Sequence, residues 1–366
     1  MLKHSTLRRA SGRAASLTLT LAWILFSGSA ALLPAASRAQ STTPIAHSTT
    51  SIYGPHGVSP LAVRQGILGS CYFHASLAAV AQANPAALHD AIRGNAQVGY
   101  RVHFVSGPDE LVYPIDIAYA QEHKYDRSEG EWVAILMRGF AQRKLRQGMI
   151  AAIQRSTLIP ALIKPIALSA LEGTGPLLVA YDRAIRSVVS QDGQLDKATF
   201  QAHLAQELTT LGISAAQAQI VEGLLDHAGF YEELNNTVKE NGEVFGAYRG
   251  MSQGGIPRSV MTAFLGNAAA ARVTSPDLLE QLRAVHSRGK AMVAGSRTAS
   301  PFSSHPPDWY IPDHAYTVLD YDADTRVVTL RNPWGSRPSP DGIFTLSLPV
   351  FEQTYWMFSY SEAAMR

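Results

Sequence analysis

A hairpin pattern occupies residues 315–331, which read AYTVLDYDADTRVVTLR. Two runs rich in aromatic and β-branched residues flank the cluster Asp322-Ala323-Asp324-Thr325, whose residue types favour turns. The pattern predicts two antiparallel strands, at 315–321 and 326–331. If the turn centres on Ala323, paired residues have numbers that sum to about 646, and His314 then lies opposite Asn332.

The helical patterns fall mainly before residue 245 and the strand patterns mainly after it. Apolar residues at helical spacing predict helices at 70–83, 132–145 and 278–285, and most of 150–240 is helical in composition. Further strands are predicted at 100–105, 111–117, 291–294, 344–348 and 355–360. We therefore expect an α+β protein in which a helical part and a β-rich part border a cleft.

The first 39 residues have the order of a secretory signal peptide. Four basic residues within the first 13 precede an apolar run at 17–26, and small residues up to Ala39 offer a cleavage site. The apolar run is short for a membrane span, so no stable membrane anchor is expected after removal of the leader. The chain is expected to be exported, to the periplasm or outside the cell.

The leader also accounts for the net positive charge of the whole chain. Five of the 31 Lys and Arg residues lie within residues 1–39, which hold no Asp or Glu. The remaining 26 stand against 29 acidic residues, a net charge of about −3, so no nucleic-acid partner is expected. With one cysteine, the chain has no internal disulfide.

That cysteine lies at a predicted helix start, in the stretch QGILGSCY at 65–72. Ser70 is the expected N-cap, and the N–H groups and dipole of a helix start stabilise a thiolate, which makes Cys71 a candidate nucleophile. Gln65 stands across a Gly-rich loop. Its amide is a candidate, with the Cys71 backbone N–H, for stabilising an oxyanion. A core thiol and a turn glutamine are the ordinary alternatives.

The predicted hairpin supplies a base for this thiol. An amide at Asn332 can orient the imidazole of His314, and an imidazolium near the thiol would lower the pKa of Cys71. Trp334 is placed to screen the histidine–asparagine hydrogen bond from water. Taken alone, His314 also fits an ordinary core or surface histidine.

Three segments together resemble the calpain family of cysteine peptidases, namely QGILGSC at 65–71, HAYTV at 314–318 and LRNPWG at 330–335. Residues 131–136 are similar to a helix of that family, and 248–265, with Gly254-Gly255, looks like its glycine-rich substrate-cleft segment. The resemblance covers roughly residues 60–150 and 245–360. It implies a papain-like two-lobed fold, an endopeptidase acting on proteins or peptides, and a thioester on Cys71.

The expected organisation follows from the leader, the resemblance and the spacing of Cys71 and His314. It consists of a signal peptide at 1–39, a flexible lead-in or short propeptide at 40–60, a cysteine-bearing helical lobe at 61–149, a helical insertion at 150–244 and a β-rich lobe at 245–366. The insertion is interpreted as a structural elaboration, with a lid, an exosite or an inhibitory element as alternatives.

The chain departs from the family pattern at three positions. Ser70 stands where the family usually has Asp, Tyr72 where it has Trp, and Asp313 where it has Gly. Asp313 adds bulk and charge to the cleft wall, which bears on substrate preference more than on catalysis. No family calcium ligands can be matched, so calcium dependence rests on the resemblance alone, and no cofactor or metal is expected.

Two other motifs carry less weight. GMSQG at 250–254 matches the nucleophile elbow of serine hydrolases around Ser252, but that fold needs preceding βα units, which 150–240 lack. Residues 190–200 resemble part of an EF-hand loop, yet Val188 and Thr199 occupy positions where calcium needs carboxylates. Two functions besides peptide hydrolysis stay open: acyl transfer or amide hydrolysis on the same fold, and secreted binding without activity.

Overall fold

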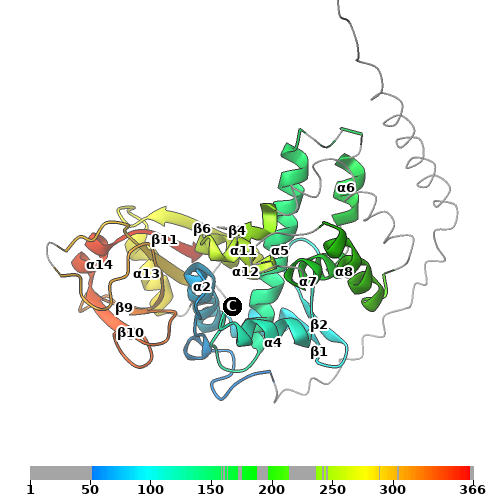
Figure 1. Ribbon diagram of the computed structural model, residues 1–366. Coiled ribbons are helices and arrows are strands. Elements are labelled where there is room, and N and C mark those ends of the chain that lie inside the picture. Colours follow the sequence, from blue (N-terminus) through cyan, green and yellow to red (C-terminus); the bar gives the residue numbers. More distant parts are fainter. Residues whose placement is uncertain are drawn as a thin grey trace, which may run out of the picture. The chain divides into compact units, whose positions relative to one another are not determined.

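In the computed structural model, the hairpin at 315–331 is formed by β8 (Ala315–Asp322) and β9 (Val327–Arg331) (Figure 1). It is the centre of a six-stranded antiparallel sheet with the strand order β10-β9-β8-β7-β11-β6. The other strands and the two helices of this part are β6 (Ala268–Arg272), α13 (Leu278–His286), β7 (Met292–Ser296), β10 (Ile343–Ser347), α14 (Leu348–Thr354) and β11 (Tyr355–Ser361).

The structure describes residues 52–362 apart from 158, 160, 163, 172–174, 188–196, 214–235, 241–242, 245, 288 and 303–304. All described residues belong to the unit His47–Arg366. The predicted leader and most of the EF-hand-like stretch lie outside them. None of the helices described is long and apolar enough to cross a membrane.

The helical part precedes the sheet in the chain. Its longer helices are α2 (Cys71–Ala83), α4 (Pro114–Glu122), α5 (Trp132–Arg155), α6 (Lys164–Leu171), α7 (Gly175–Ser187), α8 (Lys197–Thr210) and α12 (Pro257–Leu265). Shorter elements are η2 (Pro60–Ala62), α3 (Pro85–Asp90), β1 (Ile92–Asn95), β2 (Gly99–Val102), β3 (Glu110–Val112), β4 (Lys239–Glu240), β5 (Glu243–Val244), η3 (Gly246–Tyr248) and α11 (Arg249–Ser252). The described residues therefore form an α+β protein, as predicted.

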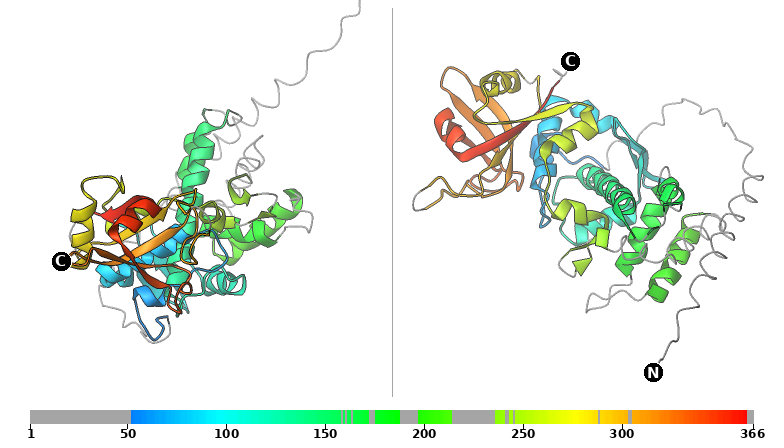
Figure 2. Two further views of the ribbon diagram at one scale, coloured as in Figure 1. Left: turned by 90° about the vertical axis from the view of Figure 1, so that its left-hand side faces the viewer. Right: turned by 90° about the horizontal axis from the view of Figure 1, so that it is seen from above.

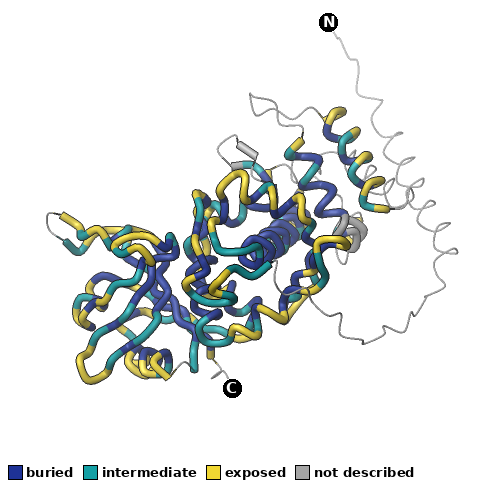
Figure 3. The backbone as a smooth tube through the Cα atoms, turned by 90° about the horizontal axis from the view of Figure 1, so that it is seen from below, coloured by how far each residue is buried: buried dark blue, intermediate teal, exposed yellow. Residues whose placement is uncertain are grey.

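The sheet separates two hydrophobic cores. Ala315 packs into the core of the helical part, whereas Tyr316 and Val318 pack into the core that contains α13 and α14. Strand β7 alternates in the same way, with Val293 on the first side and Ala294 on the second. This period of two follows from the pleat of a β-strand, and buried residues run through the strands of the sheet (Figure 3).

Helix α2 packs directly on the inner face of this sheet. The Thr317 hydroxyl of β8 donates a 2.9 Å hydrogen bond to the carbonyl of Ala75 in α2. Figure 2 shows α2 between the sheet and the other helices. The first residue of α2 and the first residues of β8 are thereby brought together, and these segments carry Cys71 and His314.

Two of the expected segment boundaries fall differently in the structure. Residues 52–60, expected within a flexible lead-in, are packed: Tyr53 forms a β-bridge with Gly130, and the Ile52 carbonyl accepts hydrogen bonds from the backbone N–H groups of Glu131 and Trp132. The boundary expected at 149/150 lies within α5, which continues to Arg155.

The described helices of the 150–244 region belong to the main core. Leu178 and Tyr181 of α7 and Phe200 of α8 are buried in the same hydrophobic cluster as α2 and α5. These helices therefore share the core of the helical part.

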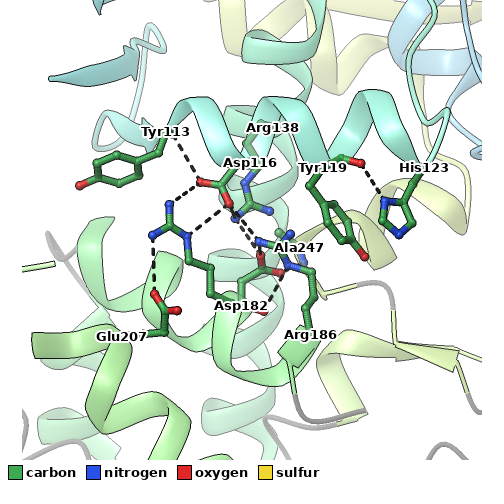
Figure 4. Close-up of polar contacts among 10 residues, drawn as sticks. Tyr113, Asp116, Tyr119, His123, Arg138, Asp182, Arg186, Glu207 and Ala247 are labelled. Carbon is green, nitrogen blue, oxygen red and sulfur yellow. Dashed lines mark hydrogen bonds and ion pairs between the residues drawn. The ribbon is translucent and has the colours of Figure 1, made fainter. Parts of the chain in front are cut away.

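A buried network of charged residues joins α4, α5 and α7 (Figure 4). Arg138 of α5 has no exposed side-chain surface and donates a 2.8 Å hydrogen bond to Asp182 of α7. Arg183 and Arg186 of α7 bind Asp116 of α4 at 3.1 and 3.0 Å. Burial by itself raises the pKa of Asp116, but the three guanidinium groups outweigh it and lower that pKa to about 2.

One predicted strand is replaced by a helix. The stretch 111–117 forms only the short strand β3, and α4 begins at Pro114. Proline is well suited to the first helical position, and the Asp116 carboxylate accepts a hydrogen bond from the backbone N–H of Tyr113, the N-cap residue. Local capping therefore overrides the β-type pattern.

Candidate active site

Cys71 is the first residue of α2 and is partly buried. The Gly-rich loop before it fits tightly against other backbone segments: a Cβ on Gly66 would collide with the Lys124 carbonyl, and one on Gly69 with the Ser252 carbonyl. These close approaches explain why glycine occupies positions 66 and 69. They also bring Ser252 and the segment after it to the cysteine loop.

Ser70 does not cap α2 with its side chain, contrary to the sequence prediction. Its hydroxyl lies 3.1 Å from Nδ1 of His74, whose Nε2 is 3.2 Å from an Asp126 oxygen. This series resembles a serine–histidine–aspartate triad, but the Ser70 and His74 side chains are fully buried and out of reach of a substrate. Because Gln65 forms a β-bridge with Asp126, the series anchors the cysteine loop.

His314 lies immediately before β8 and is tightly held. Its backbone N–H donates to the Ser296 hydroxyl at 2.9 Å, and its carbonyl accepts from the Ser296 N–H at 2.9 Å. The preceding residue, Asp313, has a left-handed φ of 50°. Aspartate is one of the few residues besides glycine that tolerates this conformation, so the backbone turn survives the departure from the family pattern.

The predicted contact between His314 and Asn332 is present. Nε2 of His314 lies 3.1 Å from Oδ1 of Asn332, which also accepts the Trp334 backbone N–H at 3.1 Å. The Trp334 and Tyr316 rings flank the imidazole, with centroid distances of 5.1 and 4.9 Å. The imidazole is therefore enclosed by aromatic rings, in the place where the sequence predicted a screen from water.

The register behind this contact differs from the predicted one. Thr317 pairs with Arg331, a sum of 648 instead of 646, and a bulge between Val318 and Asp320 raises the sum to 649 near the turn. When the numbers of paired residues sum to 648, Asn332 is two positions away from the residue opposite His314, so the two are diagonal neighbours. A shift of two preserves the face of a strand, so the two side chains still meet.

The thiol lies beside the start of β8. Burial raises the pKa of the Cys71 thiol, and hydrogen bonds from the backbone of Ala315, Tyr72 and Cys71 itself oppose this rise without cancelling it. Ala315 directly follows His314. The helix start therefore favours the thiolate, as expected, but burial outweighs it, and the expected lowering of the thiol pKa is not found.

Burial acts on the histidine as well. It lowers the pKa of His314 to about 4, although the hydrogen bond to Asn332 raises it. An imidazole that is 6% exposed loses most of the water that would stabilise its charged form. Both shifts favour a neutral thiol beside a neutral imidazole in the free protein.

This depressed pKa predicts a loss of stability in acid. The unfolded chain binds a proton at His314 near pH 6.5, whereas the folded chain binds it only near pH 4. The stabilisation is thus present above about pH 6.5 and is lost as pH falls towards 4, by about 3 kcal/mol in the free energy of unfolding. Urea unfolding of the wild type and of His314→Gln across this range measures the difference. Parallel pH profiles would contradict the assignment.

The other predicted site residues surround the same place. The Gln65 side-chain amide donates to the Leu68 carbonyl at 2.7 Å, and its backbone N–H donates to the carbonyl of Pro333, between Asn332 and Trp334, at 2.8 Å. Gly255 packs so closely on the Tyr72 ring that a Cβ would collide with it. Gly254 has a left-handed φ of 76°.

One residue near the cysteine carried no sequence signal. Lys144 of α5 donates to the Tyr72 hydroxyl at 3.0 Å and to the Gly250 carbonyl at 2.6 Å. It thus fastens the 250–255 segment to α2. Burial lowers the pKa of this lysine. Nothing in the helical pattern of α5 separates Lys144 from an ordinary surface lysine.

The serine of the GMSQG motif is differently placed. Ser252 is the last residue of the short helix α11, and its hydroxyl donates to the Arg249 carbonyl at 2.7 Å. A nucleophile elbow instead needs a sharp turn from a strand into a helix. Among the described residues, no group of three or more His, Cys, Asp or Glu side chains is arranged to hold a metal ion.

Comparisons with known proteins give little further information. No family model matches the chain, and no curated protein matches it in sequence. Among solved structures, it is similar to the crystal structure of PepW from Lactobacillus rhamnosis HN001, with a TM-score of 0.30 and 10% sequence identity over 96% of this chain and 89% of that chain. A likeness at this TM-score carries no weight for fold or function.

Proposed function

We propose that the chain is an exported cysteine endopeptidase of the calpain type, with a papain-like fold, that hydrolyses peptide bonds through a thioester on Cys71. The observation that carries the proposal is the 3.1 Å contact between Nε2 of His314 and Oδ1 of Asn332. The backbone of Ala315, the residue that follows His314, is among the groups that lower the pKa of the Cys71 thiol, which supports a thiol close to this pair. The leader-like residues 1–39 support export.

The hydrogen bonds of Asn332 assign the roles of the two imidazole nitrogens. Because Oδ1 of Asn332 also accepts the Trp334 N–H, it is an acceptor, and Nε2 of His314 must carry a proton. Nδ1 is then the basic atom. As Sγ attacks the carbonyl carbon, Nδ1 takes the thiol proton, and it gives this proton to the leaving amine when the C–N bond breaks.

A water molecule completes the cycle by the reverse route. It attacks the thioester carbon while Nδ1 accepts its proton, and the C–S bond breaks as the proton returns to sulfur. Gln65 is proposed to donate to the oxyanion in both steps. One N–H of its amide is used by the Leu68 carbonyl, which fixes the side chain and leaves the second N–H for the substrate.

The neutral resting pair fits this scheme. Each charge is unfavourable alone in a buried site, but a thiolate and an imidazolium formed together stabilise each other. Proton transfer is therefore expected to accompany substrate binding. We propose that Gly254, Gly255 and Trp334 contact the substrate, because Trp334 packs against the imidazole and Gly255 packs against the ring of Tyr72, the residue after Cys71.

Cleavage of fluorescently labelled casein by the protein from Gln40 onward tests the proposal. The assay is run under reducing conditions, with and without calcium, and with and without prior alkylation by iodoacetamide. We expect hydrolysis that alkylation abolishes. Hydrolysis that persists after complete alkylation of Cys71 would overturn the proposal, and the calcium pair measures the metal dependence suggested by the family resemblance.

Replacing Asn332 by alanine is expected to lower kcat by roughly 10- to 100-fold, with little change in KM. The substitution removes the acceptor that orients the imidazole, and a hydrogen bond of this kind contributes about 1–3 kcal/mol. Asn95→Ala is the matched control, because it removes an asparagine whose side-chain oxygen likewise accepts two N–H groups, both of them backbone groups outside the site. Equal kcat in both variants would contradict the role of Asn332.

Two alternatives use the same residues differently. Acyl transfer differs from hydrolysis only in the group that attacks the thioester, so a new amide product after addition of an amine identifies it. A binding protein without activity would show no turnover in any assay. The joint presence of Cys71, His314, Asn332 and Gln65 around one place favours an enzyme.

A further inference from the structure

A groove with a volume of about 510 Å³ opens on the β-rich part of the protein. It lies outside the set of residues assigned to catalysis. Its lining combines two guanidinium groups, two threonines, a small residue and a large aromatic ring: Arg272, Arg297, Thr274, Thr298, Ala299 and Trp356.

The strand order places this groove at the catalytic end of the sheet. His314 precedes the start of β8, and Arg297 follows the end of the neighbouring antiparallel strand β7. Trp356 lies at the start of β11, and Arg272 at the end of β6, the next two strands along. Adjacent strands are about 4.8 Å apart, so the groove begins about 5 Å from β8 and extends to about 14 Å.

A hydrogen bond links the groove directly to the catalytic segment. The Thr298 hydroxyl donates to an Asp313 oxygen at 2.7 Å, and Asp313 is the residue before His314. The position of the 297–299 wall is thus tied to that of the histidine. An extended chain advances about 3.3 Å per residue, so a peptide leaving the thiol reaches the far end of the groove after about four residues.

Trp356 is the extra residue of a β-bulge. Strand β11 advances from Tyr355 to Met357 while its partner β7 advances only from Ser296 to Gly295. Such bulges redirect a side chain, and Trp356 is 45% exposed instead of buried in the adjacent core. A large aromatic ring on the surface, beside two arginines, offers a flat contact for a ligand.

The positive charge of the groove is not neutralised by the residues that line it. Among the described residues, neither Arg272 nor Arg297 forms an ion pair, and Arg297 uses its Nε to bind the Gln353 carbonyl at 2.8 Å. The carboxylate of Asp313, on the side towards the histidine, accepts the Thr298 hydroxyl through one oxygen and forms no ion pair with Arg272 or Arg297. The terminal nitrogens of both guanidinium groups therefore remain for an anionic ligand, and guanidinium groups bind carboxylates in a fork geometry.

We propose that this groove is a subsite for acidic side chains of an extended peptide substrate, at positions up to about four residues from the scissile bond. Glu or Asp carboxylates bind Arg272 and Arg297, while the peptide chain lies on Trp356. The inference rests on the proposed peptidase function for its substrate, but the binding of an acidic peptide can be measured without catalysis.

The test uses labelled peptides with a shared core flanked by Glu, Gln or Lys residues. Fluorescence anisotropy measures their binding to the full chain carrying Cys71→Ala, with and without Arg272→Gln and Arg297→Gln together. We expect the double substitution to weaken Glu-peptide binding at least about tenfold and to leave Gln-peptide binding unchanged. Arg283→Gln, an exposed arginine on α13, is the matched control and is expected to change neither.

A second variant separates the two contributions. Trp356→Ala is expected to weaken the Glu and Gln peptides alike, because it removes the flat contact and keeps the charges. Equal binding of Glu, Gln and Lys peptides to the parent chain would overturn the proposal, as would unchanged Glu-peptide binding in the double variant with native thermal unfolding.

A parallel hydrolysis assay on the chain with Cys71 intact keeps the two proposals distinguishable. Cys71-dependent hydrolysis with no preference for Glu would overturn the groove and leave the peptidase standing. A Glu preference in binding without any hydrolysis would support the groove and overturn the peptidase.

Discussion

Replacing Cys71 by alanine is expected to abolish hydrolysis, with a fall in kcat of roughly 10⁴- to 10⁶-fold under reducing conditions. The reason is that the proposed thioester forms on this sulfur, and the sequence contains no other cysteine. Folding should be little affected, because Cys71 as a whole residue is partly buried and the substitution removes a single heavy atom. Labelled casein measures the rate, and thermal unfolding verifies the fold.

Ser252→Ala is the control for the alternative nucleophile. The Ser252 hydroxyl donates to a carbonyl within its own helix, so its removal is expected to leave kcat within about twofold of the wild type. Activity lost with Ser252 and kept with Cys71→Ala would reverse the assignment of the site. If neither the variants nor the wild type hydrolyse the substrate, the alternative of a binding protein without activity is favoured.

Replacing Asp182 by alanine is expected to lower the free energy of unfolding by about 3–5 kcal/mol. Asp182 is fully buried, and it is the partner that lies 2.8 Å from the fully buried Arg138. Burial alone would lower the pKa of Arg138, but Asp182 and Asp116 together raise it, so the guanidinium stays charged. Removing one carboxylate leaves that charge poorly compensated. Urea unfolding at neutral pH measures the change.

Asp320→Ala provides the surface counterpart. Asp320 pairs with His286 at 2.7 Å on α13, but both side chains are about half exposed, so the loss is expected to stay under about 1 kcal/mol. Similar losses in the free energy of unfolding for Asp182→Ala and Asp320→Ala would contradict the view that burial makes the Asp182 network important for stability. Asp182 also accepts the backbone N–H of Ala247, upstream of Gly254, so its loss should raise KM as well.

The strands of the large sheet could be predicted closely from the sequence, with one exception. Strands β8–β11 are rich in aromatic and β-branched residues, which favour strands, and the residues around β7 form a short apolar run. Strand β6 was missed because it reads AAAAR, and alanine has no preference for strands. The bulge at Val318–Asp320 was missed as well, since nothing in the composition of β8 marks an extra residue.

For the site, motifs identified the residues but not their surroundings. The Cys71, His314 and Asn332 motifs lie in the order that predicted one site, and the structure gathers their segments. The effect of burial on the two pKa values could not be predicted, because it depends on side chains that pack from distant segments. The same holds for the ion pair of Arg138 with Asp182, which are 44 residues apart.

The burial that raises the pKa of Cys71 is also expected to slow oxidation of its thiol. Peroxides react with thiolates much faster than with thiols, and sulfinic and sulfonic acids form irreversibly. A protein with one cysteine and no resolving partner cannot return a sulfenic acid through an internal disulfide. For the proposed exported peptidase, keeping the sulfur protonated until a peptide arrives would therefore extend the time over which the thiol stays reactive outside a reducing compartment.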